Sequence, residues 1–467
     1  MKTIRIILAL FLTFSLFFLG EDIHADEKES FYTILLDKNA DVDEWIGKFS
    51  SSNSQVVYMV KEIGLLQIKT TSKTMKSLEN NSSIRAFNQS INNEQDKLNN
   101  LHDDILSESS LWKMQWDMQK ITNNGESYSV YPGTKNVTVG IVDSGLDFNH
   151  PDLKNNIIEG SKNLVPSGGF QGGEIEETGD INQINDINGH GTLVAGQIAA
   201  NGRIKGVAPG IGIKSYRALG KKKSENIWII KGIVEAAKDD VDVINVSLGS
   251  YLINGIVHSN NDRSVNNLAE IEGYKRAIQF AKNQGSVVVA AVGNDSLNLK
   301  DNKQMHEFFK GKAEDEMDMS NKIFDAPASF NDVVAVASVN MKDELSIFSN
   351  YGEGIIDIVA PGGDLRLYKQ YGENDWINKG FYLQETIFST WPGGYFTTYG
   401  NSLAAPKVSA TLALIIDQNK YKNQPEKSID FLYKYGVKSN IKNSRLYGHG
   451  ILDVDNAVKT AGRMSNK

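Results

Sequence analysis

The sequence contains no cysteine among its 467 residues. This absence excludes disulfide scaffolds, thiol nucleophiles, iron–sulfur clusters and cysteine-ligated zinc. An excess of basic charge is also missing, since 49 Lys and Arg stand against 57 Asp and Glu, for a net charge of -8. Because proteins that bind nucleic acid carry a basic face, this composition argues against a nucleic-acid partner. With 40% hydrophobic residues the chain can build a sizeable core, and its length suggests two or three compact units.

Long apolar segments are absent as well. Lys2 and Arg5 precede an apolar run at 6–20, which is shorter than the roughly 20 residues that a membrane helix needs. A basic start, a short apolar middle and a polar continuation after Ala25 are typical of a secretory signal peptide. We therefore expect residues 1–25 to be a signal peptide, and the mature protein to be secreted (extracellular) without a membrane anchor.

Residues 26–95 have the pattern of a small α+β unit of their own. Strand and helix patterns alternate along it, at 31–36, 42–49, 55–70 and 72–78. A polar stretch from Gln89 to Asp104 offers little to bury, which is typical of a linker open to proteolysis. We place a linker or processing region at 96–111 and the second unit at 112–467.

The second unit has the pattern of an α/β sheet. Near-continuous apolar runs suit strands that are buried on both faces of a parallel sheet. They cover 137–142, 241–246 and 287–292, with helical patterns at 226–238 and 274–283 between them. This alternation predicts a mostly parallel sheet flanked by helices, with its functional site at the carboxyl ends of the strands.

Three polar motifs stand at the expected strand and helix ends. Asp143 follows the first apolar run, His190 opens one helical pattern and Ser402 opens another that continues to about Asp417. A serine hydroxyl needs a base to become a nucleophile, histidine suits that role at neutral pH, and a carboxylate fixes its tautomer. Each residue alone could be a structural cap. Together, Asp143, His190 and Ser402 predict a nucleophilic site.

An oxyanion site is predicted beside them. Ser402 lies at a helix N-terminus, so its backbone N–H points to the space where an oxyanion would form. Asn294 follows the third apolar run and offers a side-chain amide to the same oxyanion. The other histidines show no metal spacing, and no His-Glu-x-x-His motif occurs, which argues against a zinc protease.

From Trp112 to Val458 the chain resembles the subtilisin-like serine proteases, or subtilases. The matching segments contain Asp143, His190 and Ser402, together with Gly206-Val207-Ala208-Pro209 and Tyr447-Gly448-His449-Gly450. The resemblance implies a subtilisin-like fold, a serine endopeptidase with an Asp143–His190–Ser402 triad, and Asn294 in the oxyanion hole. It also implies that Ser247, Leu248 and Gly249 pair with the substrate backbone.

The same resemblance implies that residues 26–95 are a ferredoxin-like propeptide. Such a propeptide assists folding and caps the active site until it is cleaved, so the chain would be a zymogen. We expect a monomer whose partners are its peptide substrate and its own propeptide. No cofactor is expected for the chemistry. Structural calcium is an option at Asp152, although the loop at 200–203, where further ligands usually lie, is short.

The nucleophile motif departs from the usual Gly-Thr-Ser-Met of the family. Asn401 and Leu403 replace threonine and methionine, and both keep the character of the residue they replace. Gly400 to Ala404, with Pro406-Lys407-Val408, is similar to the lantibiotic leader peptidases, a branch of the subtilases. Those enzymes remove the leader from a ribosomally made antimicrobial peptide, commonly after arginine.

Two acidic clusters could attract such an arginine, because a carboxylate holds a guanidinium bidentately. They contain Glu174, Glu176, Glu177, Asp180 and Asp186, and Glu314, Asp315, Glu316 and Asp318. We expect at least one carboxylate between Glu307 and Asp325 to line the specificity pocket; the alternative is a solvated surface loop. Two other functions stay open: a broad-specificity degradative subtilase, and a catalytically inactive binding protein on a subtilase scaffold.

Overall fold

The computed structural model describes residues 28–52, 54–94, 111–255, 257–258, 264–310, 316–317, 321–438 and 444–465. The expected signal peptide at 1–25 lies outside these residues, as does the expected processing region at 96–111 except for Leu111. In the part of the chain that the structure describes, no helix combines the length and apolar character needed to cross a membrane.

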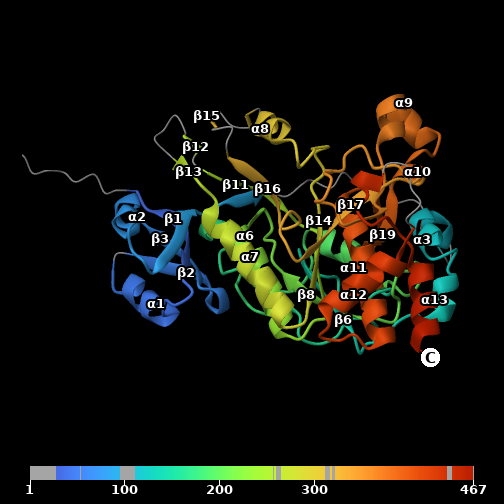
Figure 1. Cartoon of the computed structure of the whole chain (residues 1–467), viewed down its shortest axis with the longest axis horizontal. Coiled ribbons are helices and arrows are strands. Elements are labelled where there is room, and N and C mark those ends of the chain that lie inside the picture. Colours follow the sequence, from blue (N-terminus) through green and yellow to red (C-terminus); the bar gives the residue numbers. More distant parts are fainter. Residues whose placement is uncertain are drawn as a thin grey trace, which may run out of the picture.

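The N-terminal unit is a four-stranded antiparallel sheet with two helices on one face (Figure 1). Its elements follow in the order β1 (Ser30–Leu36), α1 (Val42–Ser50), β2 (Gln55–Val60), β3 (Leu65–Thr70), α2 (Ser72–Leu78) and β4 (Ile84–Gln89). The spatial order β2-β3-β1-β4 is that of a ferredoxin-like unit. Side-chain caps begin both helices, since Asp41 accepts the Asp43 N–H and Thr71 accepts the Thr74 N–H.

The second unit contains a nine-stranded sheet in the order β21-β22-β18-β17-β14-β10-β6-β8-β7. The strands are β6 (Thr138–Asp143), β7 (Lys162–Asn163), β8 (Gly212–Arg217), β10 (Val243–Val246), β14 (Val287–Ala291), β17 (Val333–Val339), β18 (Ile358–Pro361), β21 (Val437–Lys438) and β22 (Ile451–Leu452). All neighbouring pairs are parallel except β21 with β22. The sheet is therefore mostly parallel, as the apolar runs predict.

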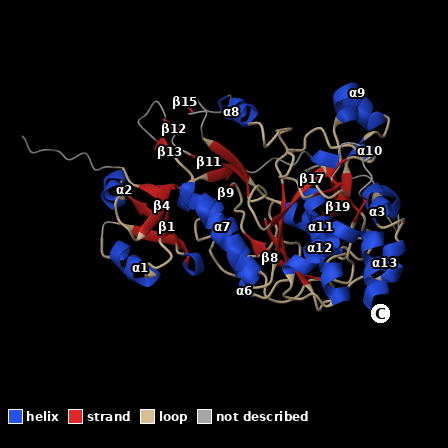
Figure 2. Ribbon diagram, viewed as in Figure 1, coloured by secondary structure: helices blue, strands red, loops and turns tan. Residues whose placement is uncertain are grey.

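Helices cover both faces of this sheet (Figure 2). On one face lie α6 (Asn226–Lys238) and α7 (Leu268–Asn283), and on the other α5 (His190–Ala199), α11 (Asn401–Asn419), α12 (Pro425–Tyr435) and α13 (Val454–Ser465). The N-terminal sheet packs its second face on α6 and α7. These two helices are thus shared between the units.

Smaller elements surround the carboxyl edge of the sheet and the helical layer. They include the antiparallel pairs β5 (Asn92–Glu94) with β9 (Lys223–Glu225), β11 (Ser250–Asn254) with β16 (Lys322–Ala326), and β19 (Ile387–Trp391) with β20 (Gly394–Thr398). A further small sheet joins β12 (Val257–His258), β13 (Ser264–Val265) and β15 (Glu316–Met317). The remaining helices are α3 (Trp116–Ile121), α4 (Glu126–Val130), α8 (Asn302–Lys310), α9 (Arg366–Asn378) and α10 (Tyr382–Glu385).

The first residues of the polar stretch at 89–104, which was predicted to be a linker, form part of a β-strand pair. β4 ends at Gln89, and β5 then pairs with β9 of the second unit. Because both partners of this pair are polar, no apolar alternation marks either strand in the sequence.

Candidate active site

Asp143 and His190 form the centre of the candidate site. Asp143 is the last residue of β6, and its carboxylate Oδ1 lies 2.8 Å from His190 Nδ1. The Asp143 side chain is fully buried, whereas the His190 side chain remains 14% exposed. A carboxylate at Nδ1 favours the tautomer in which Nε2 is the acceptor, so the exposed edge of the ring can serve as a base.

A tight turn places His190 at the start of α5. The preceding residue, Gly189, has φ of 96°, and a Cβ there would lie 2.1 Å from the Trp391 ring. Only glycine fits this conformation and this space.

Asp186 ties this helix start to the end of β6. Its carboxylate accepts the N–H groups of Gly189 at 2.7 Å and Thr192 at 2.8 Å. It also accepts the Ser144 hydroxyl at 2.8 Å, next to Asp143. One carboxylate therefore holds both segments that carry the candidate dyad.

Ser402 is the second residue of α11, which packs against α5. Leu403, next to it, and Leu193 of α5 belong to one small apolar cluster. The Ser247 hydroxyl donates to the Ser402 carbonyl at 3.0 Å. These contacts bring the start of α11, the start of α5 and the end of β10 to one edge of the sheet.

Asn294 lies beside Ser402 across Gly400. A Cβ at Gly400 would lie 3.2 Å from Ser402 Oγ and 3.7 Å from Asn294 Nδ2. Asn294 Oδ1 accepts both the backbone N–H of Asn401 at 2.9 Å and its side-chain amide at 3.0 Å. With its oxygen used in this way, the NH₂ group is the part of the Asn294 side chain that could donate to an oxyanion.

Two backbone segments could receive an extended peptide. Ser247–Gly249 follows β10, and in the described structure these residues belong to no strand. Strand β9 already pairs with β5. The two segments are linked, because Ser250 donates to the Asn226 side chain at 2.8 Å immediately after β9.

Asp325 is a buried carboxylate close to Gly249, the last residue of the first segment. It is 2% exposed, accepts the Gly293 N–H at 2.8 Å, and lies 3.6 Å from the position of a Cβ at Gly249. Burial raises the pKa of the Asp325 carboxyl to about 6, although the hydrogen bonds from Gly293 and Asn350 limit the rise. In the expected range, Glu307 is exposed, while Glu314, Asp315 and Asp318 fall outside the described residues, as does the Glu316 side chain.

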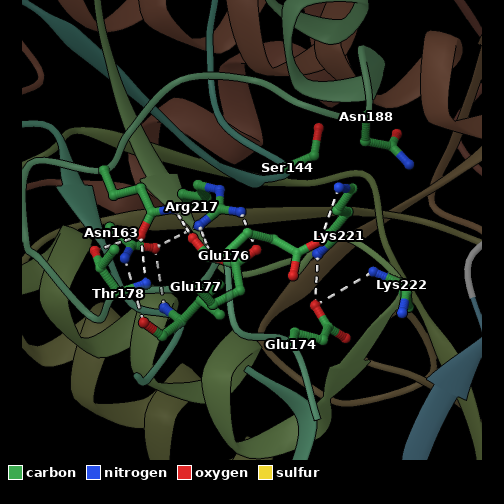
Figure 3. A network of polar contacts seen from close by, with 12 residues as sticks. Ser144, Asn163, Glu174, Glu176, Glu177, Thr178, Asn188, Arg217, Lys221 and Lys222 are labelled. Carbon is green, nitrogen blue, oxygen red and sulfur yellow. Dashed lines mark hydrogen bonds and ion pairs between the residues drawn. The ribbon is translucent and has the colours of Figure 1, made fainter. Parts of the chain in front are cut away.

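Glu174, Glu176 and Glu177 of the first acidic cluster bind basic side chains or backbone N–H groups of the protein itself (Figure 3). Glu177 is fully buried in an ion pair with Arg217 at 2.6 Å, and Glu174 accepts backbone N–H groups of 221–223. Glu176 is exposed and pairs with Lys221 at 2.7 Å. Asp186 caps α5. The interpretation of this cluster as an open negative rim is therefore wrong for Glu174 and Glu177.

The calcium site that the resemblance allows does not fit the contacts of Asp152. Its carboxylate accepts the Arg203 and Ile204 N–H groups at 3.1 Å each and the Tyr395 hydroxyl at 2.9 Å. Across the described residues, no group of three or more His, Asp or Glu could hold a metal ion. Asp152 instead caps the backbone of the short loop.

Sequence reasoning placed Asp186 in an acidic cluster but missed its role at the start of α5, and it missed β9 and the role of Asn401. Asp186 precedes a helix start by four residues, and an acidic residue near a helix N-terminus is a usable signal. Asn401 was identified only as a departure from the family motif. For β9, the run Lys221-Lys222-Lys223 gives no strand signal.

Comparison with known proteins agrees with this geometry. Residues 134–453 match the subtilase family model. The chain is 39% identical to the epidermin leader peptide-processing serine protease of Staphylococcus epidermidis, over 96% of this chain and 98% of that protein. It is 45% identical to the nisin leader peptide-processing serine protease of Lactococcus lactis subsp. lactis, over 67% of this chain and only 45% of that protein's length. The crystal structure of the epidermin protease from Staphylococcus aureus superposes with a TM-score of 0.83 at 40% identity, covering 93% of this chain and 99% of that one. The chain therefore belongs to the subtilase family of serine proteases, and its fold is subtilisin-like.

Proposed function

We propose that the protein is a secreted endopeptidase that removes the leader from a lantibiotic precursor by cutting after arginine. The observation that carries this proposal is the 2.8 Å contact of Asp143 with His190 at the sheet edge where Ser402 and Asn294 also lie. The near full-length similarity to a leader peptide-processing protease supports the substrate class.

In the proposed reaction, Ser402 Oγ attacks the peptide carbonyl while His190 takes its proton. His190 then returns the proton to the leaving amine, and Asp143 holds the imidazole and stabilises its charged form. The Asn294 side-chain NH₂ and the Ser402 N–H donate to the oxyanion of the tetrahedral intermediate. Water then attacks the carbonyl of the acyl-enzyme, with His190 again taking and returning the proton. This step releases the acid product and restores the Ser402 hydroxyl.

The substrate adds a strand between Ser247–Gly249 and β9, so that its backbone hydrogen bonds give affinity. The pairing of β5 with β9 supports this docking, because β5 is an extended segment that comes just before the expected processing region. In this arrangement β5 occupies the place of a substrate strand, and residues 26–95 act as a propeptide that caps the site until the chain cuts itself between Glu94 and Leu111.

Asp325 recognises the arginine side chain before the cut. Its carboxylate accepts the Gly293 N–H and lies close to Gly249, and we expect the arginine side chain to pass between these two glycines. A buried carboxylate that binds a guanidinium in this position forms a charge-assisted, bidentate pair. No cofactor enters the chemistry, and we expect the mature enzyme, 112–467, to act as a monomer.

The test is mass spectrometry of a leader-bearing lantibiotic precursor after incubation with the purified chain. We expect one cut, after the arginine that ends the leader, and at least a 10⁴-fold loss of cutting for Ser402→Ala. The Ser402→Ala variant should also leave its own N-terminal unit uncut. As a control for folding, its unfolding temperature should equal that of wild type. Casein digestion at a comparable rate would favour a broad degradative subtilase, and an uncut precursor would favour an inactive binding protein.

A further inference from the structure

The segment between Asp143 and His190 is anchored at the end of β8. Glu177 binds Arg217 through two hydrogen bonds, of 2.8 and 2.6 Å, and both side chains are fully buried. Arg217 is the register partner of Asp143 in the parallel pair β6–β8. Glu177 thus fixes a point within this segment to Arg217, the last residue of β8 (Figure 3).

Three residues before this anchor, Glu174 holds the loop that leads into β9. Its Oε2 accepts the N–H groups of Lys221 at 2.9 Å and Lys222 at 3.4 Å, and its Oε1 accepts the Lys223 N–H at 3.2 Å. Glu174 is only 3% exposed. A Cβ at Gly220 would lie 2.9 Å from Glu174 Oε2, so the loop and the carboxylate are in close contact.

We infer that Glu174 is a positioning residue that fixes strand β9 for the docking of extended substrates. This inference rests on the proposed function, in which the substrate strand takes the place that β5 has on β9. Lys223 is both a hydrogen-bond donor to Glu174 and the first residue of β9. The carboxylate therefore determines where the docking edge begins.

Glu174 acts at a distance from the reacting atoms. Replacing the carboxylate with an amide sets an NH₂ donor against backbone donors, so the loop must move. A peptide that reaches β9 then loses part of its added-strand pairing. A substrate that ends at the arginine never contacts β9, and it reports only on the reacting groups and the specificity pocket.

The test compares Glu174→Gln with wild type on two substrates that share the arginine. One is a leader-derived peptide with six residues before the arginine, and the other is benzoyl-arginine p-nitroanilide. We expect kcat/KM for the long peptide to fall by about tenfold or more, through KM, because charge-assisted hydrogen bonds are lost. The value for the short substrate should stay within about twofold. The matched control is Glu176→Gln, the same change at an exposed pair of the same segment, which should alter neither.

An equal loss on both substrates, or no loss on either, would overturn the inference. If Glu174→Gln does not fold, Glu174→Asp carries the same test, because the shorter side chain withdraws the carboxylate from the N–H groups of 221–223. Wild type that cuts neither arginine substrate would instead count against the proposed function. The two failures are thus distinguishable.

Discussion

At the scale of single residues, the candidate site depends on side chains that hold the reacting groups in place. Asn401, which stands where the family usually has threonine, turns the Asn294 amide by donating to its oxygen at 3.0 Å. The Asn401 side chain is itself held, since its oxygen accepts the Ser349 hydroxyl at 2.9 Å. Asn401 therefore makes a polar contact that holds the expected oxyanion donor in place.

The role of Asp325 gives a prediction for specificity. We expect Asp325→Asn to lower kcat/KM by about 100-fold for peptides with arginine before the cut, because the guanidinium loses its charged partner. Peptides with methionine there should change by less than about threefold. Asp295→Asn, a nearby exposed carboxylate, is the control and should keep the arginine preference. An equal loss for both peptides would contradict this role.

The same carboxyl predicts a pH dependence of specificity. Its pKa is raised to about 6 by burial, so in the empty site it loses its charge as the pH falls through 6. The ratio of kcat/KM for arginine to methionine peptides should therefore fall below pH 6. Protonation of His190 affects both peptides and cancels in this ratio.

The sequence predicts those candidate site residues that stand at the end of a strand pattern or the start of a helix pattern. Asp143, His190, Asn294 and Ser402 each follow a strand run or open a helix, so the rule of strand ends finds them. Asp325 was predicted only as part of a range, because its position depends on the pairing of β11 with β16. That pairing is tertiary, and no local pattern encodes it.

At the scale of elements, α11 is held by a buried ion pair close to Ser402. Lys407 Nζ lies 2.9 Å from Asp117 Oδ2 of α3, and both side chains are fully buried. Burial lowers the pKa of Lys407, and the Asp117 carboxylate opposes this effect. Helix α3 follows the expected processing region, so this pair fastens the first α-helix after that region to α11, which carries Ser402.

Removing one partner of this pair should lower the free energy of unfolding strongly, whereas replacing both partners with apolar residues should lower it much less. We expect Lys407→Met to lower the free energy of unfolding by about 3–5 kcal/mol, because it leaves the Asp117 charge buried and unpaired. The double variant Asp117→Leu/Lys407→Met should recover most of that loss. Urea unfolding in the Ser402→Ala background measures both. A loss below about 1 kcal/mol in the single variant would mean that the pair is not charged.

Element boundaries show where sequence reasoning succeeds and where it stops. The predicted helices at 72–78 and 226–238 have these bounds in α2 and α6, since apolar periodicity marks them. The predicted strand at 241–246 begins later, at Val243, and the Asp242 carboxylate just before it accepts the Thr138 N–H at 2.9 Å. The pair of β5 with β9 carried no apolar signal at all.

At the scale of the whole molecule, the N-terminal unit closes over two buried carboxylates. Glu225 accepts the Gln67 amide at 2.7 Å, and Glu270 of α7 is buried against the N-terminal sheet. Burial raises the pKa of each carboxyl to about 7, and the hydrogen bonds from Gln67 to Glu225 and from Thr33 and Asn88 to Glu270 limit the rise. Closure therefore favours their protonated forms.

Release of the N-terminal unit should consequently depend on pH. Both carboxyls return towards their ordinary pKa of 4.5 when exposed, so closure takes up protons between about pH 4.5 and 7. We expect the affinity of the cleaved unit to weaken from pH 5.5 to pH 8 by roughly tenfold for each carboxyl. Co-elution of the fragments of Ser402→Ala, cut between Glu94 and Leu111 by an added protease, measures this affinity. The Glu225→Gln/Glu270→Gln variant should flatten the dependence, and an affinity that rises with pH in wild type would refute it.

Fluorophosphonate labelling of the purified chain at pH 8, where the N-terminal unit should bind most weakly, tests whether Ser402 is a nucleophile activated by His190. We expect one label, located by mass spectrometry on Ser402, and its loss in folded His190→Ala. A label on another residue, or undiminished labelling of Ser402 without His190, would contradict it.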